Sequence, residues 1–208
     1  MIEINEKDGH PTSNLEGFLA CRLLPLDKDP GLRPIGVGEV LRRVMGKVFM
    51  RTVRDEVQAV GGSLQVCVGQ PGGCEAAVHA MKECFDEEDS DAVLLIDARN
   101  AFNSLNRATM LENIRRICPI LYVFAYNCYA VHAKLFVVGG VTMFSQEGTT
   151  QGDPISMALY GIGLLPFLKV LHEQTSVSEC NRDLTQVAFA DDISGESNLL
   201  MLRFYLDF

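Results

Sequence analysis

Several features of common protein classes are missing from these 208 residues. Tryptophan is absent, histidine occurs four times, and no two of the seven cysteines form a Cys-x-x-Cys pair. This cysteine usage disfavours a disulfide framework and a zinc site, and it is typical of free thiols in a reducing compartment. No uncharged run reaches the roughly 20 apolar residues of a membrane helix. The acidic residues 1–6 are unlike a signal peptide, so we expect an intracellular protein, in the cytoplasm or nucleus, that is not secreted and binds no membrane.

Positive charge is scarce overall, with 18 Lys and Arg against 27 Asp and Glu and a net charge of -9. The charge is nevertheless unevenly spread. Residues 22–54 carry eight basic and three acidic side chains, a local excess of five positive charges, whereas residues 83–91 hold six acidic ones. Because phosphate binding depends on local charge, the acidic total does not exclude a nucleic-acid partner.

Apolar residues make up 48% of the chain and charged residues 22%, which is enough to form a core. Continuous apolar character predicts a strand over 92–96 that is buried on both faces. Two hairpins are predicted, 134–138 with 141–145 around Gly139-Gly140, and 186–190 with 193–194 around Asp191-Asp192. Apolar spacing predicts helices over residues 11–24, 39–60, 75–85, 106–118, 119–131, 153–174 and 199–208. This mixture indicates an α+β fold.

Three motifs follow one another along the chain. Asp97 ends the predicted strand 92–96 and precedes Phe102 by five residues, a Gly-rich loop covers 148–154, and Asp191-Asp192 follows Phe189-Ala190. Each has an ordinary structural explanation when taken alone. An Asp after a strand often caps a helix, Gly-Asp-Pro often begins one, and turns tolerate Asp-Asp.

Taken together, the motifs predict a metal site. Asp97 and Asp191 belong to separate predicted strands that can be neighbours. Paired carboxylates raise each other's pKa unless a cation neutralises them, and ligands that are all oxygen favour Mg²⁺ over zinc. Two such ions about 3.5–4 Å apart serve phosphoryl or nucleotidyl transfer.

The ordered motifs resemble those of reverse transcriptases, in particular the enzymes of non-LTR retrotransposons. Asp97 with Phe102 looks like motif A of that family, residues 148–154 look like motif B, and residues 189–192 look like motif C. Upstream, residues 26–36 look like the fingers motif that precedes the palm. The resemblance covers about residues 22–196, most of the chain.

The resemblance implies a right-handed polymerase fold in which an antiparallel palm sheet packs on helices. Residues 1–90 would form part of the fingers, and residues 91–208 would form a palm truncated after the third motif, with the thumb absent. The implied activity is that of an RNA-directed DNA polymerase, which adds dNTPs to the 3′-hydroxyl of a DNA primer on an RNA template by two-metal nucleotidyl transfer. The implied cofactor is Mg²⁺, as two ions, with Mn²⁺ as a substitute.

The family's catalytic roles transfer to three carboxylates. Asp97 and Asp191 would bind both metal ions, with a further ligand from the carbonyl oxygen of Ala98. Asp192 would lie beside the primer end as a weaker ligand.

The family's nucleotide-binding roles transfer to five other residues. Phe102 would lie under the incoming sugar and exclude a 2′-hydroxyl by bulk, because an apolar pocket alone rejects an added hydroxyl only about 100-fold. Gln151 and Gly152 would let the backbone approach nucleotide and template closely. Lys28 and Arg33 would bind the triphosphate, although a solvated turn explains these two almost as well.

Residues that follow Asp192 number only 16, so we expect a fragment whose thumb or other downstream domains belong to a longer protein. Without a thumb to hold primer and template, we expect this chain to polymerise poorly. Two alternatives remain open: a repurposed fingers-palm module that binds nucleic acid or protein without catalysis, and another palm enzyme such as a nucleotide cyclase or viral RNA polymerase. Phe102 argues against RNA synthesis, because a ribonucleotide pocket needs room for the 2′-hydroxyl.

Overall fold

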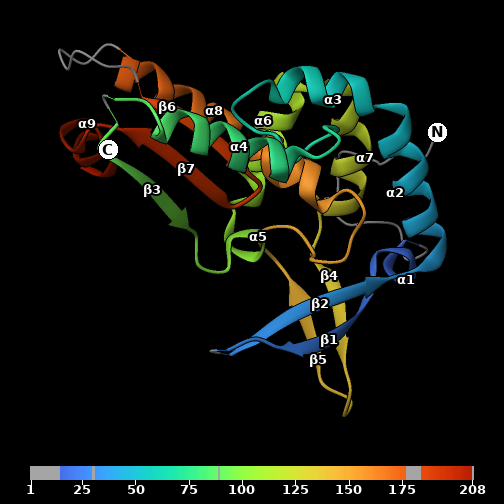
Figure 1. Cartoon of the computed structure of the whole chain (residues 1–208). Helices are drawn as coiled ribbons and strands as arrows, with labels where there is room; N and C mark the ends of the chain where they lie inside the picture. The colour runs from blue at the N-terminus through green and yellow to red at the C-terminus, as the bar shows by residue number, and fades with distance from the viewer. Residues whose placement is uncertain (1–14, 30, 89, 177–183, 208) are drawn as a thin grey trace. The chain divides into compact units, whose positions relative to one another are not determined.

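The structure, a computed structural model, describes residues 15–29, 31–88, 90–176 and 184–207. Its contacts divide the chain into two compact units, each built from two separate stretches (Figure 1). The first unit comprises residues 1–53 and 100–160, and the second comprises 54–99 and 161–208. Both units combine helices with a sheet, which confirms the predicted α+β class. The division of the chain into fingers (1–90) and palm (91–208) stays a prediction.

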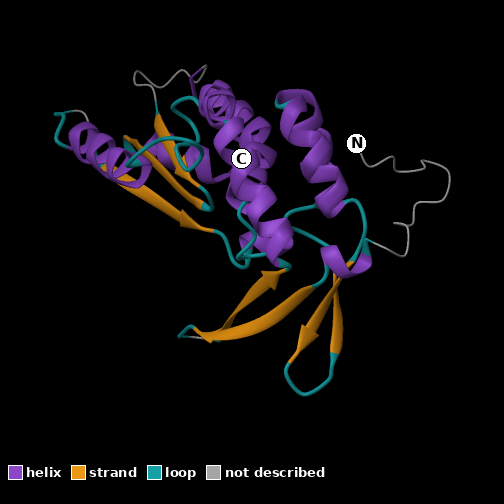
Figure 2. Cartoon of the chain, turned by 90° about the vertical axis from the view of Figure 1, so that its right-hand side faces the viewer, coloured by secondary structure: helices purple, strands orange, loops and turns teal. Residues whose placement is uncertain are grey.

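The first unit contains a four-stranded mixed sheet (Figure 2). β1 is parallel to β4, whereas β1–β2 and β4–β5 are antiparallel. The β4–β5 hairpin is the one predicted around Gly139-Gly140, where both glycines have positive φ. In sheet order the strands are β2 (Leu32–Gly38), β1 (Cys21–Asp27), β4 (Ala133–Val137) and β5 (Thr142–Ser145).

The helix predicted over residues 11–24 is wrong in its second half. α1 covers only Glu16–Leu19, and the chain enters β1 at Cys21. β1 is bonded to strands on both sides, and these ladders outweigh the helical spacing of its apolar residues. Residues 11–14, the predicted start of that helix, lie outside the described residues.

In the first unit, α6 and α7 confirm the helices predicted over 106–118 and 119–131, whereas the short helix α5 was not predicted. α6 begins after Asn106, whose side-chain oxygen accepts from the Thr109 amide at 2.8 Å. α6 and α7 pack against each other, and the rings of Phe49 and Phe124 stack with centroids 5.1 Å apart. These helices are α2 (Val40–Thr52), α5 (Ala101–Ser104), α6 (Arg107–Ile117) and α7 (Pro119–Tyr129).

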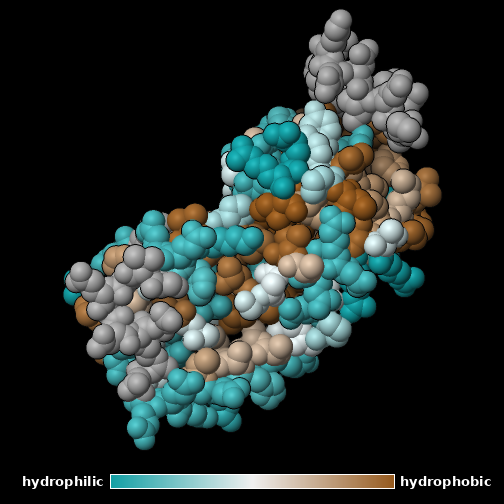
Figure 3. All heavy atoms as spheres, turned by 90° about the horizontal axis from the view of Figure 1, so that it is seen from above, coloured by the Kyte–Doolittle hydropathy of each residue, from teal (hydrophilic) through white to brown (hydrophobic). Residues whose placement is uncertain are grey.

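The long helix predicted over 39–60 is two helices, because α2 ends before Val53 and α3 (Arg54–Gly61) follows. One apolar side of α2 faces outward, since Val40, Leu41, Val44 and Val48 are exposed. The buried side of α2 carries Arg42 and Gly46 instead. Figure 3 shows one face of the molecule, on which hydrophobic residues (brown) lie among hydrophilic ones (teal).

The second unit is built on an antiparallel sheet of order β3-β7-β6. One face of this sheet packs against α8 and α9, and the other packs against α4. The unit's elements are α4 (Gly73–Phe85), β3 (Ala92–Asp97), β6 (Thr185–Phe189), β7 (Asp192–Ser197), α9 (Leu199–Asp207) and the greater part of α8 (Ser156–Ser176).

Predictions for the second unit are confirmed for the helices α4, α8 and α9 and for the β6–β7 hairpin. The predicted burial of β3 on both faces is wrong, because β3 is an edge strand and Leu95 is 74% exposed.

Within the described residues, no helix is both long enough and apolar enough to span a bilayer. The six cysteines that the structure describes are all free.

Candidate functional site

The second unit brings two of the predicted carboxylates together. Asp97 ends β3, Asp192 begins β7, and the antiparallel register sets them directly opposite each other. Residues so paired share a face of the sheet, with Cβ atoms about 4.5–5.5 Å apart. Both side chains are exposed, so the two negative charges face each other in a place that a ligand can reach.

Asp191 lies in the turn of the β6–β7 hairpin, next to Asp192. We call residues 189–192 the carboxylate hairpin. Ala190 in this turn has φ +57°, a left-handed conformation that non-glycine residues rarely adopt. Asp191 is half-buried and acts on the nearby Cys67. Burial above all, with a contribution from the Asp191 charge, raises the pKa of the Cys67 thiol to about 12.

A metal ion would find carboxylate oxygens here but no complete protein cage. Among the described residues, no three His, Cys, Asp or Glu side chains form a group that could hold a metal ion. Mg²⁺ does not require one, since it is usually bound through one or two carboxylates plus substrate phosphates. The opposed pair Asp97 and Asp192 therefore fits such an ion in its ligand type, while the predicted ligand Asp191 lies one residue earlier, in the turn.

Asp97 and Asp192 also lie at a pocket of the second unit. The remaining lining is largely apolar and comes from α4, β3, β6 and β7. The exposed Leu95 of β3 belongs to it. The carboxylates are thus accessible from a hollow with apolar walls.

Phe102 belongs to the first unit and lies in α5. Its ring is half-buried and stacks on Tyr160, with centroids 4.7 Å apart and an interplanar angle of 26°. Its carbonyl oxygen accepts from the Thr149 amide at 2.6 Å. These contacts join motif A to the motif B loop within this unit.

Gln151 and Gly152 are held against β2. The Gly36 amide donates to the Gln151 carbonyl oxygen at 2.7 Å. Gly152 has φ +103°, and a Cβ there would come within 2.8 Å of the Gly36 carbonyl oxygen. The contact between Gly152 and β2 is thus sufficient to require glycine at this position. A close approach of Gly152 to nucleotide or template stays a prediction.

Gln151 lines a pocket of the first unit, together with residues of β1, β2, β4, β5, α5 and the loop after β5. Lys28 and Arg33, the predicted triphosphate ligands, do not line this pocket. Both side chains are exposed near the turn of the β1–β2 hairpin, where the Lys28 amide donates to the Gly31 carbonyl oxygen at 3.0 Å. Their role stays a prediction.

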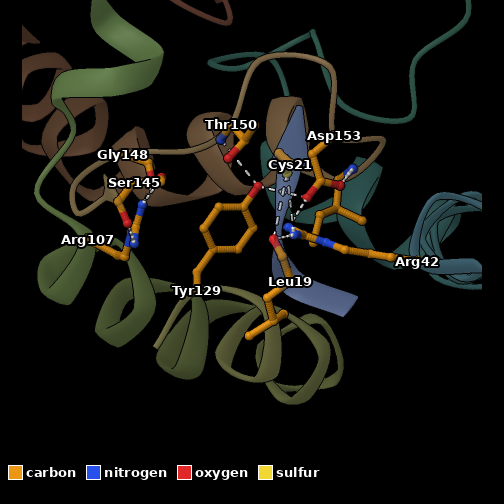
Figure 4. Close-up of polar contacts among 10 residues, drawn as sticks. Leu19, Cys21, Arg42, Arg107, Tyr129, Ser145, Gly148, Thr150 and Asp153 are labelled. Atoms are coloured by element: carbon orange, nitrogen blue, oxygen red, sulfur yellow. Dashed lines mark hydrogen bonds and ion pairs between the residues drawn. The ribbon is translucent and has the colours of Figure 1, made fainter. Parts of the chain in front are cut away.

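The sequence reasoning missed a buried polar network that holds the motif B loop (Figure 4). Arg42 of α2 forms an ion pair with Asp153, and both side chains are almost fully buried. The Tyr129 hydroxyl donates to Asp153 Oδ2 at 2.8 Å, and the Thr150 amide donates to the Tyr129 oxygen at 3.3 Å. Arg42 also donates to the Leu19 carbonyl oxygen at 3.0 Å.

Arg107 holds the same loop from the other side of Tyr129 (Figure 4). Its guanidinium donates to the carbonyl oxygens of Ser145 at 2.9 Å, Glu147 at 2.9 Å and Gly148 at 3.1 Å. The guanidinium carbons of Arg42 and Arg107 lie 5.5 and 5.4 Å from the centroid of the Tyr129 ring, so one aromatic ring stacks with two cations. We call Arg42, Arg107, Tyr129 and Asp153 the loop network.

Burial sets the ionisation of the loop network. Burial, with the Asp153 charge next in size, raises the pKa of Tyr129 well above its ordinary value. Burial acts to lower the pKa of Arg42, but its neighbours, led by Asp153, outweigh that effect and raise it. Burial lowers the pKa of Arg107. The network therefore consists of a neutral phenol between charged groups.

The sequence leaves two interpretations open for the basic residues of the helix predicted over 39–60, a phosphate-facing stripe or a solvated face; these residues are Arg42, Arg43, Lys47, Arg51 and Arg54. Neither interpretation holds for Arg42, which is 3% exposed and paired with Asp153, whereas Lys47 and Arg51 are exposed. A signal was present in the sequence: Arg42 and Gly46 are one helical turn apart, and a glycine in mid-helix often marks a close approach. Gly46 does lie against Pro154 and Ile155.

Comparison with known proteins relates the chain to one kind of structure. No protein-family profile and no curated protein matches it in sequence. Apo telomerase from Candida tropicalis, truncated from its C-terminal domain, is similar over 91% of this chain and 46% of its own, with a TM-score of 0.63 and 14% identity.

Two further telomerase structures match in the same way. Full apo telomerase from Candida tropicalis covers 95% of this chain and 41% of its own, with TM-score 0.62 and 13% identity. Telomerase from Candida albicans, in complex with a TWJ fragment of telomeric RNA, covers 99% of this chain and 41% of its own, with TM-score 0.61 and 10% identity. The chain therefore spans less than half the length of these telomerases and shares the fold of the matched part.

Proposed function

We propose that this chain is the catalytic part of an RNA-directed DNA polymerase, a reverse transcriptase that extends a DNA primer on an RNA template. The observation that carries the proposal is the register of β3 and β7, which sets Asp97 opposite Asp192 beside the turn that bears Asp191. The fold shared with telomerase, a specialised reverse transcriptase, supports the same activity. The motifs' resemblance to non-LTR retrotransposon enzymes points to the narrower class.

In this proposal the carboxylate hairpin supplies the ligands for magnesium. When bound, two Mg²⁺ ions would neutralise the triphosphate and lower the pKa of the primer hydroxyl. Asp97 and Asp192 offer exposed oxygens from opposite strands, and Asp191 offers a third carboxylate from the turn. Because like charges directly opposite each other destabilise a sheet, the pair is best explained by a cation that binds there.

The first unit supplies the nucleotide contacts in this proposal. Phe102 is fixed by its stacking on Tyr160, which suits a ring that must reject a 2′-hydroxyl by its position. The motif B loop is held by backbone bonds to β2 and by the loop network, so Gln151 and Gly152 are presented by a rigid support. Lys28 and Arg33 are exposed cations that would bind phosphates.

The metal-binding step is tested by titrating the chain with Mn²⁺ and dATP and measuring free Mn²⁺ by electron paramagnetic resonance. We expect Asp97→Asn, Asp191→Asn and Asp192→Asn each to weaken binding, because each removes one of the three carboxylates at this end of the sheet. The control is Glu88→Gln, which removes one charge from an exposed position of the same unit. Equal binding by the wild type, the three Asn variants and the control would remove the basis of the proposal.

Primer extension then tests the reaction itself. With an RNA template, a DNA primer, dNTPs and Mg²⁺ at low salt, we expect this chain to give only weak extension, and that extension should disappear with Asp191→Asn. RNA binding that persists in all three Asn variants, without any extension, would instead favour a repurposed module that binds nucleic acid.

Sugar selection is a separate consequence of the proposal. Phe102→Ala should raise incorporation of ribonucleotides relative to deoxyribonucleotides, because the ring that excludes the 2′-hydroxyl is removed. Tyr160→Leu, which removes the stacked partner but keeps the Phe102 ring, is the matched control and should have the smaller effect. An unchanged ratio in Phe102→Ala would assign the ring to packing alone.

A further inference from the structure

Gln65 is a polar residue buried beside the carboxylate hairpin. Its side chain is 1% exposed, and it comes from the segment between α3 and α4. A buried amide costs free energy unless its donor and acceptor are both bonded. Its partners therefore show what holds it in this position.

The donor and the acceptor of the Gln65 side-chain amide both bond to a single residue of the carboxylate hairpin. Gln65 Nε2 donates to the Ala190 carbonyl oxygen at 3.1 Å, and the Ala190 amide donates to Gln65 Oε1 at 2.8 Å. Ala190 is the residue with φ +57° that directly precedes Asp191. The amide thus clamps both backbone groups of the residue whose strained conformation sets the direction of the turn.

The backbone around Gln65 is fixed to the same hairpin. The Val66 amide donates to the Ala188 carbonyl oxygen and the Ala188 amide donates to the Leu64 carbonyl oxygen, each at 2.9 Å. These bonds form a parallel bridge between Gln65 and Ala188. Gln65 therefore cannot shift along β6 without breaking backbone bonds.

Gly161 of α8 lies against the side chain of Gln65. A Cβ at Gly161 would come within 3.0 Å of Gln65 Cγ and 2.9 Å of Cys67 Sγ. The absence of a side chain at 161 is therefore what leaves room for the Gln65 side chain in this position.

We propose that Gln65 is a positioning residue that holds the carboxylate hairpin in the geometry needed for metal binding. It acts through the Ala190 backbone and touches neither substrate nor metal. This inference rests on the proposed function, since it concerns the same metal site. Groups that orient metal ligands in this indirect way typically change metal affinity about 10–100-fold when they are removed.

The test measures Mn²⁺ affinity by electron paramagnetic resonance in folded variants of the full chain, with thermal melting to confirm folding. Gln65→Met keeps the shape but loses both bonds, and we expect its Mn²⁺ affinity to fall about 10-fold or more. Gln65→Glu keeps the acceptor for the Ala190 amide but loses the donor, so we expect a smaller fall. The matched control is Gln70→Met, because Gln70 donates to the Gly62 carbonyl oxygen instead of to the hairpin.

Gly161→Ala provides an independent variant in case Gln65→Met does not fold. It leaves the amide in place but pushes on Gln65 Cγ, so the Mn²⁺ affinity should again fall. Wild-type affinity in a folded Gln65→Met or, where that variant does not fold, in Gly161→Ala would overturn the inference.

A failure of the proposed function gives a different pattern. If wild-type binding of Mn²⁺ does not depend on Asp97 or Asp191, the metal site itself is wrong, whatever Gln65 does. Hydrogen exchange at the Ala190 amide still tests the clamp in that case. Faster exchange in Gln65→Met supports it, and unchanged exchange overturns it.

Discussion

The carboxylate hairpin and the loop network both contain acidic side chains, yet they differ in where those side chains find partners. In the loop network Asp153 is buried and is bonded by Arg42 and Tyr129. Asp192 of the carboxylate hairpin and Asp97 of the neighbouring strand β3 are exposed and face each other. Charges that are satisfied inside the fold stabilise it, whereas opposed charges left at the surface are available to a ligand. Substitutions should therefore affect stability at the first site and binding at the second.

Arg42→Met should give the largest loss of stability. It leaves the Asp153 carboxylate buried without its cation, and breaking a buried pair in this way costs about 3–5 kcal/mol. The free energy of unfolding from urea denaturation measures the effect. Lys47→Met, at an exposed position of the same helix, is the control and should change little. A loss below about 1 kcal/mol for Arg42→Met, the usual size for an exposed ion pair, would show that the network does not stabilise the fold.

Gly148→Ala should give the next largest loss in the free energy of unfolding. A Cβ there would come within 2.1 Å of the Phe102 carbonyl oxygen, and φ is +61°. Left-handed strain and overpacking together cost about 2–5 kcal/mol. Gly140→Ala separates the two causes, because its φ is +88° but nothing lies within 4 Å of the added Cβ. Equal losses in the two variants would show that the contact with Phe102 is not a constraint.

Two buried tyrosines, Tyr129 and Tyr205, differ in whether the hydroxyl group has a hydrogen-bond partner. Tyr129→Phe removes bonds to Asp153 and to the Thr150 amide, and a bond to a charged partner contributes about 1.5–3 kcal/mol. Tyr205 of α9 has no hydrogen-bond partner for its hydroxyl among the described residues. Tyr205→Phe should therefore leave the unfolding free energy unchanged or raise it.

The buried phenol of Tyr205 also predicts how the unfolding free energy depends on pH. Burial raises the pKa of Tyr205 to about 12 in the folded chain, above the ordinary value of 10.0. A raised pKa means that the unfolded chain ionises first, so the contribution to stability is complete below pH 10 and is lost as the pH rises toward 12. The decline in unfolding free energy over this range should be less steep in Tyr205→Phe than in the wild type. Equal slopes would contradict the burial of this phenol.

The smallest effect on stability should come from the carboxylates themselves. Asp97→Asn and Asp192→Asn each remove one of two opposed charges at exposed positions, so the unfolding free energy should stay within about 0.5 kcal/mol of the wild type. A slight increase is expected, since like charges opposite each other are destabilising. A loss well above 1 kcal/mol in either variant would mean that these aspartates belong to the fold, as Asp153 does.

The carboxylates at the strand ends could be anticipated because local patterns mark their places. Asp97 follows an apolar run, and Asp191 follows another, so strand ends and carboxylates coincide in the sequence. The glycine pair Gly139-Gly140 likewise predicted the turn of the β4–β5 hairpin. The order of the motifs then gave the resemblance to reverse transcriptases on which the proposed function is based.

The loop network and Gln65 could not be anticipated in the same way. Arg42 and Asp153 are 111 residues apart, and Gln65 and Ala190 are 125 apart, so no local pattern relates them. The exposure of the apolar face of α2 could not be anticipated either, because spacing shows that a helix has faces but does not show which one is covered.

The sequence alone determined that this protein is α+β, where most of its helices and hairpins lie, and which carboxylates stand at strand ends, because these depend on neighbours within a few residues. Only the tertiary structure decided that Asp192 is the residue opposite Asp97, that Arg42 is buried with Asp153, and that Gln65 clamps Ala190. Each of these contacts forms when distant segments pack, and packing selects partners by shape and by the need to bond every buried polar group.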